Sequence, residues 1–336
     1  MSLTRGYSNS CASKKQNIEK PMKANSKPNS RLNSKLISGA IGLGLLLAIA
    51  LLPLLLNLLQ PVFGLTMEPP TSNLNAVNLA PSLTFPHILG TDALGRDLLK
   101  MIAYGALGSL SVGLCSALVA VILGNLWGAL AALAGGAIDS LMMRLVDALL
   151  AVPSIILLLA LSSILSAPEL VEHFPPFLLT ALGVTSYTDG LLPYFIVILA
   201  ITATTWLESA RVARARVLAI KEEDFFMAAQ ALGSSFAQLL SKHLLPALAT
   251  TAVVEGTLLV SDAIIMESGL SFLGLGLGPS TPSWGSMLKD AQSCLTAGNW
   301  WAAVIPGLLI CFTVLSVHML GEGFFASKRA RGKISA

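Results

Sequence analysis

The sequence has 336 residues, of which 54% are hydrophobic and only 12% are charged. A typical soluble domain has about twice that charged fraction, and a soluble chain of this length needs polar surfaces for roughly two domains. The 39 charged side chains, 21 basic and 18 acidic, are too few to cover such surfaces. The composition therefore excludes an ordinary cytosolic enzyme, a disordered chain and a nucleic-acid-binding protein. A mean hydropathy of +0.75 indicates a membrane protein.

Six apolar stretches are each long enough to cross a bilayer, which takes about 20 residues in a helix. Because they are continuous apolar runs, they favour helices over the alternating pattern of a membrane β-barrel. We therefore predict an all-α polytopic membrane protein. The first span follows a polar segment and is longer than a signal-peptide core of about 7–15 residues, so we expect it to be retained. The six spans are expected at residues 37–59, 105–133, 143–166, 193–217, 247–272 and 301–323.

The basic residues predict the orientation, because cytoplasmic segments have an excess of Lys and Arg. Six spans place both termini on one side, together with every basic residue except Arg96, Lys100 and Lys289. We therefore expect both termini to be cytoplasmic. Residues 1–35 are rich in Asn, Ser and Lys and are expected to be a disordered basic tail, although contact with anionic lipid would also suit their charge.

The segment before the second span, residues 89–97 (LGTDALGRD), is expected to be a structural elbow. Gly90 and Gly95 permit turns, and the charged side chains of the segment are able to hold it with charge-assisted hydrogen bonds. These charged residues are Asp92, Arg96 and Asp97.

The cytoplasmic segment 221–246 has two apolar runs with helical spacing on either side of Gly233. Acidic residues 222–224 near its start are favourable for a helix dipole, and we expect Pro246 to end the second helix. Two short amphipathic helices of this kind form either a docking element for another protein or a pair of helices lying on lipid. The first run consists of Phe225, Ala228, Ala229 and Leu232, and the second of Phe236, Leu239, Leu240 and Leu244.

This segment resembles the cytoplasmic coupling loop of ABC importer permeases. The family signature is Glu-Ala-Ala, three residues, a glycine and a Leu-Pro about a dozen residues later. Here the matching residues are Met227-Ala228-Ala229, Gly233 and Leu245-Pro246. Methionine stands where the family usually has glutamate, which weakens any claim for a salt bridge at that position.

Four further stretches occur in the family's order and resemble the C-type permease subunit of dipeptide, oligopeptide and nickel importers. The similarity covers about residues 36–325 and implies a type I ABC importer-like permease fold with six transmembrane helices. It divides the chain into a first helix with an external segment (36–104), a core permease domain (105–325) and a basic cytoplasmic tail (326–336). The four stretches are residues 89–97, 143–154 (MRLVDALLAVPS), 267–276 (ESGLSFLGLG) and 282–288 (PSWGSML).

The resemblance implies a permease subunit that moves peptides across the cytoplasmic (inner) membrane by alternating access. The loop would seat in a separate ATPase. The chain has no Gly-x-x-x-x-Gly-Lys-Ser/Thr motif, so it is not expected to be an enzyme or to bind a cofactor or metal, and ATP and Mg are expected on the ATPase partner. The other implied partners are a second homologous permease, a second ATPase subunit or domain, an external substrate-binding protein and membrane lipid, without nucleic acid. The coupling residues are predicted to be Glu223, Phe225, Met227, Ala228, Ala229, Leu232, Gly233, Leu245 and Pro246.

Three carboxylates interrupt the fifth span: Glu255, Asp262 and Glu267. Carboxylates inside a membrane are costly and are candidates for function, so we predict that they belong to a translocation path. The alternative is an ion-coupled secondary transporter that uses them as a relay. Such transporters commonly have internal repeats, and the two halves of this sequence show none.

Small residues four apart, Gly124 and Gly128, suit close packing of the second span against another helix. The sequence leaves open whether that helix belongs to this chain or to a partner permease.

Overall fold

The computed structural model describes most of the chain between residues 30 and 332. Residues 1–29 of the predicted disordered tail lie outside the described residues, as do Phe236 and residues 333–336. For residues 30–35 the prediction of disorder is wrong, because they form the beginning of the first helix. The described residues are 30–63, 67–82, 87–167, 169, 191–235, 238–278 and 281–332.

Helices form nearly all of the regular structure in these ranges. The one β-pairing among the described residues is an isolated bridge between Thr91 and Asp97. Four helices are long and apolar enough to cross a membrane, and two bent helix pairs raise the number of candidate spans to as many as six. The four are α1 (Ser30–Phe63), α2 (Leu98–Ala134), α7 (Leu192–Lys221) and α12 (Trp301–Gly332).

The predicted third span, residues 143–166, is wrong as a single continuous helix. In its place α3 (Gly136–Leu150) and α4 (Ser154–Leu165) meet at an angle of 90°. Pro153 stands between them with a ψ of 126°, which is not helical. Proline has no N–H to continue a helix and disfavours the helical conformation in the residue before it, so the chain turns at this point.

The expectation that Pro246 ends a helix is also wrong. The π-helix η2 (Leu239–Leu244) runs directly into α10 (Leu245–Phe272), and Pro246 lies in the first turn of α10. Proline is tolerated in a first helical turn because its missing N–H is not needed there. This element bends by 55°, and the bend lies between Ala249 and Thr251.

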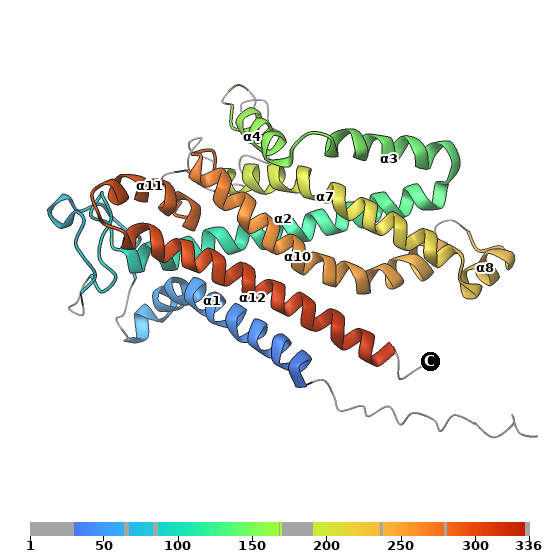
Figure 1. Cartoon of the computed structure of the whole chain (residues 1–336), viewed down its shortest axis with the longest axis horizontal. Coiled ribbons are helices and arrows are strands. Elements are labelled where there is room, and N and C mark those ends of the chain that lie inside the picture. The colour runs from blue at the N-terminus through green and yellow to red at the C-terminus, as the bar shows by residue number, and fades with distance from the viewer. Residues whose placement is uncertain are drawn as a thin grey trace, which may run out of the picture.

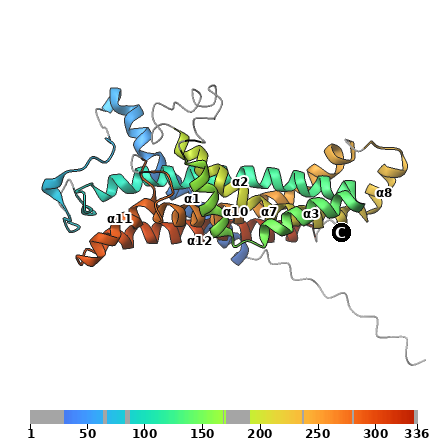
Figure 2. The ribbon, with the colours of Figure 1, turned by 90° about the horizontal axis from the view of Figure 1, so that it is seen from above.

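The long helices form an elongated bundle with α2, α7 and α10 at its centre (Figures 1 and 2). Gly124 and Gly128 of α2 face α7. A Cβ atom at Gly124 would lie 2.4 Å from the Cβ of Ser209, and one at Gly128 would lie 2.3 Å from the carbonyl oxygen of Ala210. The close-packing face predicted for the second span is therefore used within this chain.

The first helix lies on one side of the bundle and packs mainly on α12 (Figure 1). A Cβ at Gly39 would lie 2.6 Å from the backbone nitrogen of Leu320, so the two backbones approach closely. Lys35 of α1 pairs with Glu322 of α12 at 2.7 Å. The beginning of α1 and the last turns of α12 therefore lie side by side.

The elbow predicted at residues 89–97 is confirmed. Asp97 caps α2 by accepting hydrogen bonds from the backbone of Leu99 and Lys100. Arg96 donates to Asp92 at 2.7 Å and also to Asp290 of α11 (Trp284–Thr296). These bonds hold the elbow against the end of the bundle that carries α11, which we call the α11 end.

Candidate coupling and transport site

The predicted coupling segment begins as a helix and turns sharply at a glycine. Helix α8 (Asp224–Ala231) lies at the opposite end of the bundle, the α8 end (Figure 1). The N–H of Gly233 bonds to the carbonyl of Gln230, and that of Ser234 bonds to Ala229. This is the Schellman arrangement, which needs a left-handed residue after the helix. Gly233 supplies it with a φ of +81°.

Most of the predicted coupling residues lie on the surface of this segment. Met227 is 50% exposed and Leu232 is 87% exposed, while Ala229 and Leu245 are half-buried. We call the four exposed apolar side chains the docking surface. They are Phe225, Met227, Ala228 and Leu232, and the remaining predicted residues Glu223, Gly233 and Pro246 are exposed as well.

One residue of this segment was missed by the sequence reasoning. Phe226 is only 1% exposed and packs in a cluster with residues of α2, α7 and α10. The available signal was its spacing of three from Ala229, which defines a second apolar face on the same helix. The sequence analysis described only the apolar face that begins at Phe225, and in the structure most of that face is exposed.

Two ion pairs join α3 to α7 near the α8 end. Arg214 donates to both carboxylate oxygens of Asp139, at 2.6 and 2.7 Å, and Arg211 pairs with Asp147. The ammonium group of Lys221 donates to the backbone of Ala132 at 2.9 Å. These contacts fix the end of α7 to α2 and α3.

The three predicted path carboxylates occupy different environments. Glu267 is fully buried and accepts hydrogen bonds from the hydroxyls of Ser109 (2.9 Å) and Ser271 (2.7 Å). Glu255 is half-buried and close to Ser209. Asp262 is exposed and lines a cavity that neither of the other two lines, so the three do not form one cluster.

Asp262 lines a cavity of about 270 Å³ between α4, α7 and α10. Thr204, Thr205 and Glu208 of α7 line the same cavity. Glu208 is exposed and was not among the predicted site residues, although it lies inside the fourth predicted span, residues 193–217, and is a carboxylate like those of the fifth span. With Ser154 of α4, the arrangement places two carboxylates and three hydroxyls around one opening.

A family model described as the inner membrane component of binding-protein-dependent transport systems matches residues 124–322. The match includes the coupling segment and all three carboxylates. The chain belongs to this permease family. It is thus a transport subunit of the inner membrane and not an enzyme.

Individual relatives of the permease cover most of its length. It is 35% identical over 251 residues to the dipeptide transport system permease protein DppC of Bacillus subtilis, covering 75% of this chain and 70% of the relative. It is 34% identical over 253 residues to the oligopeptide transport system permease protein OppC of the same organism, covering 75% and 74%. The di/tripeptide transport system permease protein DppC of Pseudomonas aeruginosa is 35% identical over 236 residues, covering 70% and 69%.

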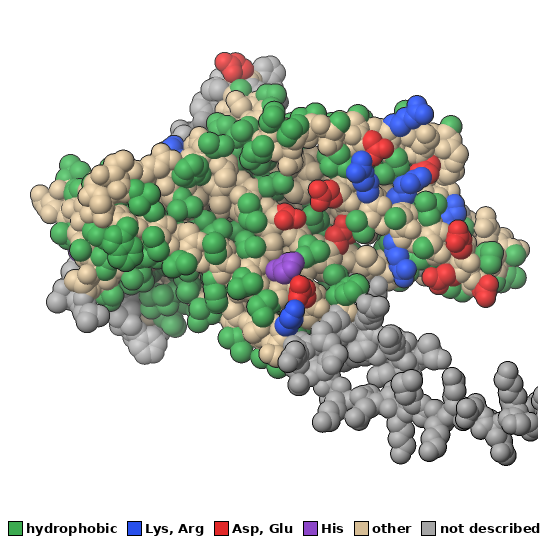
Figure 3. All heavy atoms as spheres, viewed as in Figure 1, with side chains coloured by type: hydrophobic (Ala, Val, Ile, Leu, Met, Phe, Trp, Pro, Cys, Tyr) green, Lys and Arg blue, Asp and Glu red, His purple; other side chains and the backbone are tan. Residues whose placement is uncertain are grey.

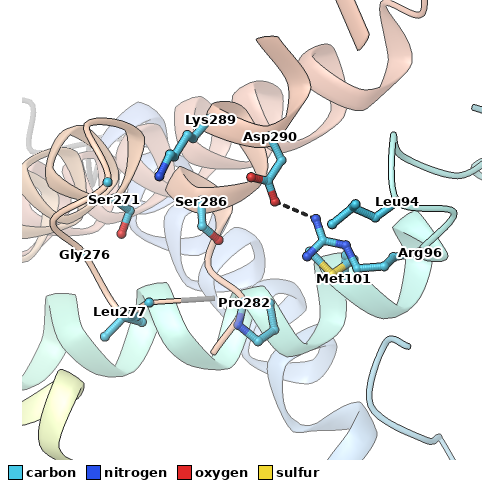
Figure 4. A pocket seen from close by; sticks show the side chains of 12 residues that line it. Leu94, Arg96, Met101, Ser271, Gly276, Leu277, Pro282, Ser286, Lys289 and Asp290 are labelled. Carbon is cyan, nitrogen blue, oxygen red and sulfur yellow. Dashed lines mark hydrogen bonds and ion pairs between the residues drawn. The ribbon is translucent and has the colours of Figure 1, made fainter. Parts of the chain in front are cut away.

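A second cavity of the permease, of about 220 Å³, lies at the α11 end (Figure 4). Arg96 and Asp290 form an ion pair in its wall, and the side chain of Lys289 points toward the end of α10. Burial lowers the pKa of Arg96, but hydrogen bonds to Asp290 and Asp92 outweigh burial and hold the pKa above its usual value. The guanidinium therefore stays charged, and it ties the elbow to α11.

Proposed function

We propose that this chain is the permease subunit of an ATP-driven importer of dipeptides or oligopeptides, and that segment 221–246 couples it to a separate ATPase. Membership of the permease family supports transport, and the names of the relatives support peptides as cargo. The observation that carries the coupling assignment is the exposed docking surface of α8 at one end of the bundle.

The charge distribution favours a protein over lipid as the partner of the docking surface. Charged side chains gather over the half of this face that ends at α8, whereas the other half is mainly apolar or uncharged (Figure 3). Apolar side chains in such a polar region mark an interaction site. Residues 222–224 beside them are acidic and exposed, and the anionic surface of a cytoplasmic leaflet repels acidic groups.

The same distribution supports a cytoplasmic α8 end and an external α11 end. Arg211, Arg214 and Lys221 lie near α8, in keeping with the excess of basic residues on cytoplasmic surfaces. The pairing of Lys35 with Glu322 agrees with termini on one side. In this orientation two ATPase subunits or domains would bind at the cytoplasmic α8 end. A binding protein would deliver peptides on the external side, at the elbow and α11.

We assign the translocation path to the cavity that Asp262 lines. The two carboxylates that line this cavity, Glu208 and Asp262, require water or a protein partner, because a charged group facing lipid is costly. A second permease packed across α4, α7 and α10 would enclose the cavity, so that alternating access would open it first outward and then inward. Glu255 is the next candidate along the path, whereas the buried position of Glu267 suits a role in joining helices.

Uptake by the reconstituted complex tests the proposal. Peptide accumulation in proteoliposomes should require ATP and persist when an uncoupler collapses the proton gradient. Loss of uptake with the uncoupler, while ATP is maintained, would contradict an ATP-driven importer.

Two variants test the docking surface separately. Leu232→Asp places a charge on that surface, and Gly233→Leu puts a bulky residue at a left-handed position. Both should lower co-purification of the ATPase at least tenfold. Arg144→Gln is the control, because Arg144 is exposed on α3 outside the segment. Normal co-purification and uptake in both variants would remove the docking assignment.

A further inference from the structure

Helix α8 has two sides with opposite environments. The docking surface is exposed, whereas the ring of Phe226 is buried to 1% exposure. Met227, the next residue along the chain, is half exposed. Neighbouring side chains of this short helix therefore point to opposite sides, Met227 to the surface and Phe226 into the bundle.

Phe226 enters a socket built from the ends of three membrane helices. Two of the lining residues are alanines of α2, which leave room for an aromatic ring between the helices. The other lining residues come from α7, η2 and the first turns of α10. The socket consists of Ala129, Ala132, Val217, Ile220, Leu239, Leu244 and Leu248, each less than 9% exposed.

Three other links between α8 and the described part of the chain are mechanically weaker. Its first turn follows α7 after the single exposed pair Glu222 and Glu223, and its last turn ends at Gly233. Ala229 also packs against the cluster, but its side chain is one methyl group. Close-packed interiors have low compressibility and transmit displacement, so the socket is the stiff connection.

We propose that Phe226 is a positioning residue that locks the coupling segment to α2, α7 and α10 together. The inference rests on the proposed function, since it assigns how the docked segment moves the helices. When an ATPase displaces α8, the ring transmits the displacement to three helix ends at once. The bond from Lys221 to the backbone of Ala132 joins two walls of the socket and keeps it closed around the ring.

The test compares Phe226→Ala with Met227→Ala in the reconstituted complex of permeases, ATPases and binding protein. Two quantities are measured for each variant: ATPase subunits captured per permease, and peptide imported per ATP hydrolysed. Phe226→Ala should leave capture within twofold of the wild type and lower the import ratio at least tenfold. Met227→Ala should lower capture and leave the import ratio of the captured complexes unchanged.

Two further variants separate positioning from folding. Phe226→Leu keeps an apolar side chain of similar reach in the socket and should restore the import ratio to within twofold of the wild type. Leu248→Ala widens the socket while α8 keeps its sequence, and it should lower the import ratio as Phe226→Ala does. If Phe226→Ala fails to accumulate in membranes, the Leu248→Ala result decides.

An unchanged import ratio in Phe226→Ala would overturn the inference. If Phe226→Ala does not accumulate in membranes, an unchanged import ratio in Leu248→Ala would overturn it instead. So would a loss of ATPase capture by Phe226→Ala equal to that of Met227→Ala, with a normal import ratio. Failure of Met227→Ala to weaken capture would contradict the docking surface of the proposed function, and that result does not depend on the Phe226 measurement.

Discussion

Replacing Gly128 by alanine should separate the two central helices of the permease. The added Cβ would lie 2.3 Å from the carbonyl oxygen of Ala210, 2.7 Å from the backbone nitrogen of Arg214 and 2.9 Å from the Cβ of Ala213. Two of these atoms belong to the backbone of α7, so a side-chain rotation does not relieve the contact. Overpacking costs about 1–3 kcal/mol, and we expect the upper part of that range.

Gly44→Ala is the matched control. Gly44 is also a helical glycine, but a Cβ there would meet nothing within 4 Å. Alanine is favoured over glycine in a helix by about 1 kcal/mol, so this variant should be as stable as the wild type or slightly more stable. The measurement is the midpoint of thermal loss of monodisperse protein in detergent, compared for the wild type and both variants. A Gly128→Ala midpoint equal to that of Gly44→Ala would refute the packing of α2 on α7.

Three further predictions concern polar contacts. Arg214→Ala should lower the midpoint in the same assay, because it leaves the buried Asp139 carboxylate without its partner at a cost of about 1–3 kcal/mol; exchanging the two residues should recover part of the loss. Glu267→Gln should keep near-wild-type stability, whereas Glu267→Leu should cost about 1–3 kcal/mol by leaving the buried Ser109 hydroxyl without its acceptor. Equal stability of these two variants would contradict that role. Asp262→Asn should lower peptide uptake severalfold with normal ATPase capture, and unchanged uptake would remove Asp262 from the path.

The hydrophobic pattern predicted the four long apolar helices α1, α2, α7 and α12, because the length of an apolar run reflects the thickness of the bilayer. The same pattern failed to predict the break at residues 143–166. This apolar run is long enough to span a membrane, but it contains Pro153 and the chain bends there by 90°. Hydropathy averages over a window and does not register a single residue that changes the backbone. The prediction that Pro246 ends a helix was wrong because the effect of a proline depends on its position. In the first turn of α10 it does not interrupt the helix.

The candidate site was predicted in outline from its motif, but not in its contacts. The apolar pattern of segment 221–246 offered two helical faces, and only packing against α2, α7 and α10 decides that Phe226 is the buried residue. The elbow was predictable because its bonds are mostly local, apart from the bond from Arg96 to Asp290. Glu255 and Asp262 are seven residues apart, a spacing that puts two residues on one face of a helix. Spacing alone does not give the bend of α10 or the cavity contributed by α4 and α7.

Cross-linking from position 232 tests the central claim most directly. A photoreactive residue in place of Leu232, at the tip of the docking surface, should cross-link to the ATPase in membranes that import peptide in an ATP-dependent manner. The same residue in place of Leu74, which is 78% exposed at the α11 end, should not. A transport-competent complex in which position 232 cross-links only to lipid, or in which both positions reach the ATPase equally, would contradict the account.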